Sequence, residues 1–347
     1  SSHFGCGFAQ LRGADPLVPG ASPVAEVRGE PLLLMGVCLS SLGLWASRVT
    51  FIFCFVTFTL PGWLLTCIAD LPFMAPRSPE SSRSFSRFIA VWMWQSWRAA
   101  IKACCWLKVD WSGAEALEEA GARGRPVFLI ANHQSFLDTP LNCVLLPRAL
   151  VPDIKVLMAR RHLRMPVLGR IAKAIGHIPI PYTTRKAGDF ALDHKEMASI
   201  HTRIDNHVSQ GGHLIVFPEG DLNSNWEKLL LFKGGGFEIC IRNDMEVWGL
   251  LTVGAGECWP ASVALGGGPA RFHSRAFRIA DSAREAAAKL AGEADLQGQG
   301  RALAAEAQQV MQRHLDAILE SRKAGGAPSE ADTGRPSAQS SGGLRAR

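Results

Sequence analysis

The sequence predicts an α/β fold with a mixed, largely parallel sheet, preceded by an N-terminal helical segment that enters a membrane. Between residues 127 and 279, short apolar segments alternate with helix-like stretches, as is typical of α/β proteins. Between 31 and 69 the only charged residue is Arg48, and a bilayer core needs about 20 apolar helical residues. A chain with 47% apolar and 20% charged residues suits a globular protein with membrane-facing parts.

The N-terminal part of the chain divides into a flexible leader at 1–30, a membrane-embedded helical segment at 31–75 and an amphipathic interfacial helix at 84–110. Within the second segment, residues 49–69 are the better candidate span. The pair Pro61-Gly62 inside it predicts a kink or a helical hairpin, and a buried core hairpin is the alternative.

The third segment places apolar and aromatic residues near helical spacing, with Arg and Lys between them. This pattern is typical of a helix lying in the membrane interface, although the same face is equally suited to packing on a catalytic domain. Basic residues downstream of the apolar run outnumber those upstream. This bias predicts that the domain after it is cytosolic.

Residues 111–280 form the predicted catalytic domain. Its apolar segments lie at 127–131, 140–146, 175–181 and 214–217, with a helix-like stretch around 193–208. Residues 281–323 are Ala-rich with an apolar stripe at helical spacing, which predicts C-terminal helices interrupted at 297–300. The Gly/Ser/Ala/Pro composition of 324–347 predicts a disordered tail.

Residues 131–140, Ala-Asn-His-Gln-Ser-Phe-Leu-Asp-Thr-Pro, follow a predicted buried strand. Ser135 followed by Asp138 is a helix-start signature, so His133 and Asp138 are expected to flank the first turn of a helix. A carboxylate bonded to one imidazole nitrogen leaves the other free to accept a proton from a hydroxyl. The alternative is that Asp138 is only the capping partner of Ser135.

Two further polar groups follow the strand predicted at 214–217. The first is Pro218-Glu219-Gly220, which places a carboxylate at a strand end and otherwise reads as a common turn. The second is Phe232-Lys233 followed by three glycines. Glycines expose backbone N–H groups to an anion and Lys233 adds a charge, although a plain flexible turn has the same composition.

In combination, these motifs resemble the glycerolipid acyltransferases, which acylate lysophosphatidic acid and other lysophospholipids. The motifs are Asn-His-x₄-Asp at 132–138, Phe-Pro-Glu-Gly at 217–220 and Phe-Lys-x-Gly at 232–235, behind a membrane segment. The resemblance covers roughly 125–260. It implies an α/β sandwich of the glycerolipid-acyltransferase type.

The resemblance also implies roles for individual residues. His133 is the expected general base and Asp138 orients its imidazole, while Glu219 lies near the glycerol hydroxyl and Gly220 permits close backbone approach. The expected substrate-binding set is Asn132, Phe217, Pro218, Glu219, Gly220, Lys233 and Arg160. No metal and no cofactor are implied, and acyl-CoA is a co-substrate.

Two arginines that the family uses for the acceptor phosphate are absent. Tyr182 stands in place of the first, and Asp221-Leu222, followed by Asn223, replaces the family's Thr-Arg. A bidentate arginine is not readily replaced. Candidates for its role are Arg160, Arg161, Lys173, Arg185, Lys186 and Lys233. Phe-Pro-Glu-Gly with a downstream Asn also resembles the tafazzin-like branch, which transfers acyl groups between phospholipids.

The remaining composition limits the class of protein. A net charge of +6 without a dense basic tract does not favour nucleic-acid binding. Nine scattered cysteines without zinc-type spacing indicate reduced thiols. The sequence contains no Gly-x-Ser-x-Gly elbow, so it does not favour a serine hydrolase.

The sequence therefore predicts a membrane-bound phospholipid-biosynthetic acyltransferase that takes an acyl group from acyl-CoA or an acyl carrier to a lysoglycerophospholipid such as 1-acyl-glycerol-3-phosphate. The alternatives are a CoA-independent transacylase and a non-catalytic lipid-binding homologue. The expected partners are membrane lipids and acyl-CoA, and the expected location is an integral or monotopic position in the endoplasmic reticulum if the source is eukaryotic. The oligomeric state has no signature in the sequence.

Overall fold

The computed structural model describes residues 30–71, 78–181 and 194–324. Residues 1–29 of the predicted leader, the tail 325–347, and Tyr182, Arg185 and Lys186 lie outside these ranges. The chain divides into two units, residues 1–42 and 43–347. The sheet and the site described below belong to the second unit.

Seven strands of the described residues form one sheet in the order β1-β7-β6-β2-β5-β3-β4. Their bounds are β1 Leu107–Ser112, β2 Val127–Ala131, β3 Ile154–Ala159, β4 Ile178–Ile180, β5 His213–Val216, β6 Glu246–Val253 and β7 Ala270–Ala280. Neighbouring strands are parallel except β6 and β7, which are antiparallel. The predicted α/β fold with a mixed, largely parallel sheet is therefore confirmed.

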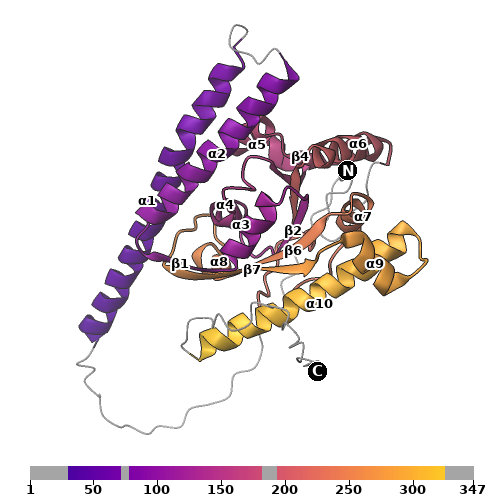
Figure 1. Cartoon of the computed structure of the whole chain (residues 1–347). Helices are drawn as coiled ribbons and strands as arrows, with labels where there is room; N and C mark the ends of the chain where they lie inside the picture. Colours follow the sequence, from indigo (N-terminus) through magenta and orange to yellow (C-terminus); the bar gives the residue numbers. More distant parts are fainter. Residues whose placement is uncertain (1–29, 72–77, 182–193, 325–347) are drawn as a thin grey trace, which may run out of the picture. The chain divides into compact units, whose positions relative to one another are not determined.

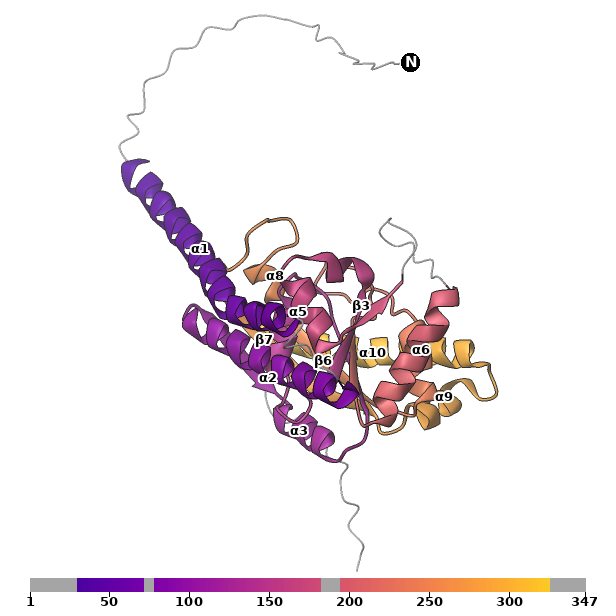
Figure 2. The ribbon, with the colours of Figure 1, turned by 90° about the horizontal axis from the view of Figure 1, so that it is seen from above.

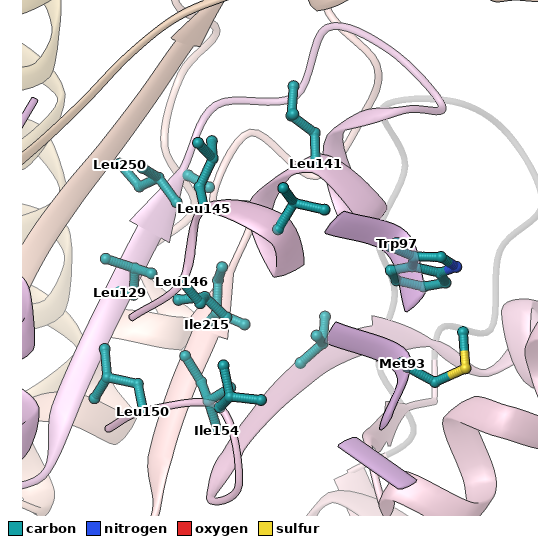
Figure 3. Close-up of a cluster of buried hydrophobic side chains, with 14 of the residues drawn as sticks. Met93, Trp97, Leu129, Leu141, Leu145, Leu146, Leu150, Ile154, Ile215 and Leu250 are labelled. Atoms are coloured by element: carbon teal, nitrogen blue, oxygen red, sulfur yellow. The ribbon is translucent and has the colours of Figure 1, made fainter. Parts of the chain in front are cut away.

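Helices cover both faces of this sheet, as Figures 1 and 2 show. Val127, Leu129 and Ala131 of β2 join one core cluster, whereas Phe128 and Ile130 join the other, because successive strand residues point to opposite faces. The first cluster, drawn in part in Figure 3, takes in side chains of α2 Pro79–Ala103, α3 Ala114–Ala122, α4 Asp138–Leu145 and α5 Leu168–Ile175. The second takes in side chains of α6 His194–Ser209, α7 Gly235–Arg242, α9 Ala283–Ala291 and α10 Leu296–Lys323.

Helix α1, Glu30–Ala69, is continuous through Pro61, so the predicted kink or hairpin at Pro61-Gly62 does not interrupt it. Gly62 instead allows α1 to approach α2, because a Cβ there would lie 2.5 Å from the sulfur of Met93. Within residues 41–69, an 18-residue stretch has a mean hydropathy of 2.0 and is 22% buried, which makes this helix a candidate membrane span. The apolar side chains exposed along it include Trp45, Val49, Phe53, Val56, Leu60, Leu64 and Ile68.

Helix α2 starts at Pro79 and ends at Ala103, earlier at both ends than the predicted 84–110. Ser78 caps its N-terminus by accepting a hydrogen bond from Ser81 N, and the chain then enters β1 at Leu107. Much of its apolar face packs on the domain, because Ile89, Met93 and Trp97 lie in the core. This is the packing alternative for the amphipathic segment, and its contact with a membrane interface stays a prediction.

Two other sequence-based expectations differ from the structure. Residues 140–146 fall mostly within helix α4. The break in the C-terminal helices lies at Gly292, where φ is +55°, and not at 297–300. Gly300 is inside α10, where it permits close contact with α7, because a Cβ there would meet the Glu238 side chain at 2.7 Å.

Candidate active site

The carboxyl ends of the parallel strands β2 and β5 bring the first two motifs together. Ile130 pairs with Val216 in the sheet, so the loops that follow both strands emerge side by side. Ala131 of β2 pairs with Leu250 of β6 on the other side. In α/β sheets, the carboxyl ends of strands are where ligands bind.

The loop after β2 holds a histidine–carboxylate pair. His133 Nδ1 lies 2.9 Å from Asp138 Oδ2, and the same oxygen accepts hydrogen bonds from the backbone N–H groups of Gln134 and Ser135. Asp138 is buried, whereas 24% of the His133 side chain is exposed. A carboxylate held by two N–H groups fixes the proton on Nδ1 and leaves Nε2 as the basic nitrogen.

The structure agrees only in part with the interpretation of Asp138 as a capping residue. Ser135 N donates to Asp138, as in a capping box, but α4 begins at Asp138 itself, with Leu137 at its N-cap position. The Ser135 hydroxyl donates to Trp259 O at 2.7 Å and accepts from Leu137 N at 3.1 Å. The carboxylate of Asp138 therefore orders the loop and also orients His133.

Replacing Ser135 by alanine is expected to lower the free energy of unfolding by about 1–3 kcal/mol, because it leaves the partly buried carbonyl of Trp259 without this donor. Acyl transfer per folded molecule is expected to stay within about threefold, since the hydroxyl bonds neither His133 nor Asp138. Chemical denaturation and an activity assay measure both, with Ser199→Ala on α6 as the control. A loss of activity without a loss of stability would contradict this expectation.

The His133 main chain is held from the loop after β5. Its N–H donates to Glu219 Oε1 at 2.9 Å, and its carbonyl accepts from Asn223 N at 2.7 Å. Phe217 packs on the imidazole, with 4.5 Å between ring centroids. The first two motifs thus form one bonded unit.

Glu219 lies beneath this unit and is 2% exposed. Its second oxygen accepts hydrogen bonds from Asn223 Nδ2 and Leu230 N, both at 2.9 Å. Burial raises the pKa of its carboxyl group, while its hydrogen bonds with Leu230, His133 and Asn223 lower it. These hydrogen bonds let Glu219 position the His133 main chain, and its contact with the glycerol hydroxyl stays a prediction.

Two residues of the expected substrate-binding set, Asn132 and Gly220, form hydrogen bonds with the protein's own backbone. Asn132 is buried and exchanges two hydrogen bonds of 2.9 Å with the backbone of Thr252, which ties β2 to β6. Gly220 has φ +79°, a conformation that favours glycine, and its N–H donates to Phe217 O. Both hold the shape of the site.

Arg160 and Lys233, the basic residues of the expected substrate-binding set, lie in different parts of the fold. Arg160 opens the 3₁₀ helix η1, Arg160–Arg164, which directly follows β3, and it forms an ion pair with Glu196. Partial burial, Arg161 and the nearby His133 lower the pKa of His162, so η1 lies close to the base. Lys233 is exposed, and its backbone N–H donates to Pro218 O at 2.9 Å.

Gln134 is a residue that the sequence patterns do not mark. It is 4% exposed, and neither atom of its side-chain amide has a hydrogen-bond partner within the described ranges. Buried amides are normally paired. No sequence signal reveals this, because it depends on the packing of distant segments around the loop.

Comparisons with known proteins find similarity to acyltransferases. Residues 108–250 match the family model described as acyltransferase. A chloroplastic 1-acyl-sn-glycerol-3-phosphate acyltransferase, BAT2, from Brassica napus is 26% identical over 178 residues, which are 51% of this chain and 45% of that protein. This chain thus spans less than half the length of that curated relative.

A solved structure shares the fold. The lysophosphatidic acid acyltransferase PlsC of Thermotoga maritima matches with a TM-score of 0.57 and 14% identity, over 80% of this chain and 97% of that one. The solved structure shows the same α/β fold, and residues 108–250 match an acyltransferase domain. The chain is thus similar to glycerolipid acyltransferases in this domain.

Proposed function

We propose that this protein transfers an acyl group from a thioester, acyl-CoA or an acyl carrier, to a hydroxyl of a lysoglycerophospholipid such as 1-acyl-glycerol-3-phosphate. The observation that carries the proposal is the 2.9 Å contact between His133 and Asp138 at the carboxyl edge of the sheet. The similarity to a 1-acyl-sn-glycerol-3-phosphate acyltransferase supports the choice of acceptor.

In the proposed reaction, Nε2 of His133 takes the proton of the acceptor hydroxyl as the oxygen attacks the thioester carbonyl. The new C–O bond forms, the C–S bond breaks, and the leaving thiolate receives the proton from the imidazolium. Asp138 stabilises the imidazolium between these steps. No covalent acyl-enzyme is needed.

The acceptor phosphate is proposed to bind the basic residues beside the base, foremost Arg160, in place of the two absent arginines. Arg160→Ala is expected to raise KM for a lysophosphatidic acid about tenfold with little change in kcat, because a charged hydrogen bond contributes about 1.5–3 kcal/mol. Steady-state kinetics with Arg148→Ala, an exposed arginine after α4, as control measure this. An unchanged KM would exclude Arg160 from phosphate recognition.

The apolar helix α1 supports a membrane anchor. The excess of Lys and Arg after this helix is the basis for proposing that the catalytic domain faces the cytosol, in the endoplasmic reticulum if the source is eukaryotic. Protease accessibility in sealed vesicles tests this topology. Protection of the domain in vesicles with the cytosolic side outward would contradict it.

A CoA-independent transacylase is the second candidate, because Asn223 stands after the Phe-Pro-Glu-Gly corner and its amide bonds Glu219. Purified protein is incubated with labelled acyl-CoA and a panel of lysophospholipids, and separately with phospholipids alone. The proposed function requires product in the first incubation. Transfer only in the second indicates the transacylase, and no product in either indicates a non-catalytic lipid-binding protein.

A further inference from the structure

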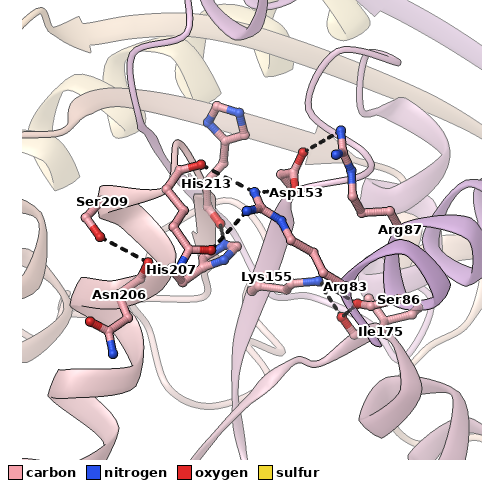
Figure 4. Close-up of polar contacts among 11 residues, drawn as sticks. Arg83, Ser86, Arg87, Asp153, Lys155, Ile175, Asn206, His207, Ser209 and His213 are labelled. Carbon is pink, nitrogen blue, oxygen red and sulfur yellow. Dashed lines mark hydrogen bonds and ion pairs between the residues drawn. The ribbon is translucent and has the colours of Figure 1, made fainter. Parts of the chain in front are cut away.

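A second polar site lies at the edge of the sheet opposite His133. A pocket of about 260 Å³ opens between the first turns of α2, the amino end of β3 and the last turns of α6, as drawn in Figure 4. Strands β2, β3 and β5 are parallel, so their amino ends lie away from the carboxyl ends that hold the base. The pocket is therefore separate from the candidate active site.

The lining of this pocket is strongly cationic. Arg83, Arg87, Lys155 and Arg203 contribute four positive groups, and Asp153 is the one carboxylate among the described residues that line it. Arg87 and Arg83 share that carboxylate at 3.1 and 3.5 Å. One negative charge against four leaves a net positive charge that nothing in the described lining neutralises.

Lys155 is the least solvated of these groups, with 9% of the residue exposed. Its ammonium donates to the Ser86 hydroxyl and to the Ile175 carbonyl, which are neutral acceptors. Burial, and then repulsion by the three arginines, lower its pKa to about 8, against the raising effect of Asp153. Lys155 is thus mostly charged at pH 7 although it is buried, a state that a bound anion would stabilise.

The size and chemistry of the pocket select the anion. Drug-sized ligands occupy about 300–1,000 Å³, so the pocket suits a compact group rather than a nucleotide or a whole lipid. Guanidinium groups match phosphate oxygens in bidentate geometry. Arg83 and Arg87 are partly exposed, so their side chains are able to turn from Asp153 toward a ligand.

The pocket also lies next to the candidate membrane helix α1. Exposed apolar residues continue along α1 to Ile68 and on to Leu71 just past its end, and Pro79 at the start of α2 lines the pocket. The two helices pack together, since Trp97 of α2 donates to Thr59 of α1. Basic pockets beside membrane helices are suited to anionic lipid headgroups.

We propose that this pocket binds a phosphate group, presented by an anionic lipid headgroup or free in solution, at a site distinct from that of acyl transfer. The test is calorimetric titration of the full chain in zwitterionic detergent, first with inorganic phosphate and then with dihexanoyl phosphatidic acid. The variants are Arg83→Ala/Arg87→Ala and Arg203→Ala. Arg148→Ala, an exposed arginine, serves as the control outside the pocket.

Each pocket variant is expected to raise the Kd for inorganic phosphate at this site at least tenfold, while the control stays within about twofold. Arg203 donates to the Gly176 carbonyl and forms no ion pair with another described residue. Its removal therefore leaves the Asp153 pairs intact and keeps the test valid if the double variant folds poorly. A phosphatidic acid Kd that lies at least tenfold below that of phosphate, and that rises in the pocket variants, assigns a lipid headgroup, whereas equal values assign phosphate itself. Binding unchanged in a folded pocket variant would overturn the proposal.

Discussion

Replacing His133 by alanine is expected to lower the rate of acyl transfer by about 10²–10⁴-fold, the contribution of a positioned general base. Its imidazole is oriented at one nitrogen by Asp138 and packs on Phe217 in a tilted geometry, and the partial exposure of its side chain gives an acceptor access to the other nitrogen. The loss is expected in kcat, because the base acts on the reacting hydroxyl rather than on the lipid as a whole. Single-turnover kinetics with labelled acyl-CoA measure it.

The variant Asp138→Asn distinguishes the orientation of the His133 imidazole from the presence of the imidazole, because it removes only the carboxylate partner. The amide can no longer stabilise an imidazolium or fix the Nδ1 proton, so activity is expected to fall by about 10²-fold or more with His133 still present. His201→Ala on α6, away from both motifs, is the matched histidine control and is expected to retain activity. Full turnover by the His133→Ala protein would assign the base to another residue.

The sequence predicts the fold where its signals are local. The uncharged runs at 127–131 and 214–217 predict the neighbouring strands β2 and β5 correctly, because burial on both faces leaves a continuous apolar run. Strands β1, β3, β6 and β7 are missed. In β7, Arg271, Arg275 and Arg278 interrupt the apolar residues. Their charges are accommodated by partners far along the chain, such as Asp110 for Arg271, at 2.7 Å.

In the candidate active site too, contacts between residues close in sequence are predictable, and contacts between distant segments are not. His133 and Asp138 are five residues apart, so their pairing follows from spacing and the resemblance. The bond of Glu219 to His133 N joins the loops after β2 and β5, which only the sheet brings together. The proposed phosphate pocket is lined by Arg83 of α2, Asp153 before β3 and Arg203 of α6. These residues are far apart in the sequence, so no local pattern predicts the pocket.

Glu219→Gln tests whether this buried carboxylate positions the base or binds the acceptor. Its two oxygens accept from His133 N, Asn223 Nδ2 and Leu230 N, and an amide would turn an N–H₂ group toward at least one of these donors. We expect a loss of about 1–3 kcal/mol in the free energy of unfolding. We also expect kcat to fall at least about tenfold, because the His133 main chain loses its anchor.

The kinetic parameters distinguish the two roles. If Glu219 positions His133, KM for the acceptor stays near the wild-type value, whereas direct contact with the acceptor requires KM to rise with kcat preserved. Asn223→Ala removes one of the three donors and should give a smaller loss of kcat in the same direction, and the exposed Glu227→Gln should change neither parameter. A rise in KM alone would restore the substrate-binding role that the motif implies, because only a residue in contact with the acceptor changes its binding without changing turnover.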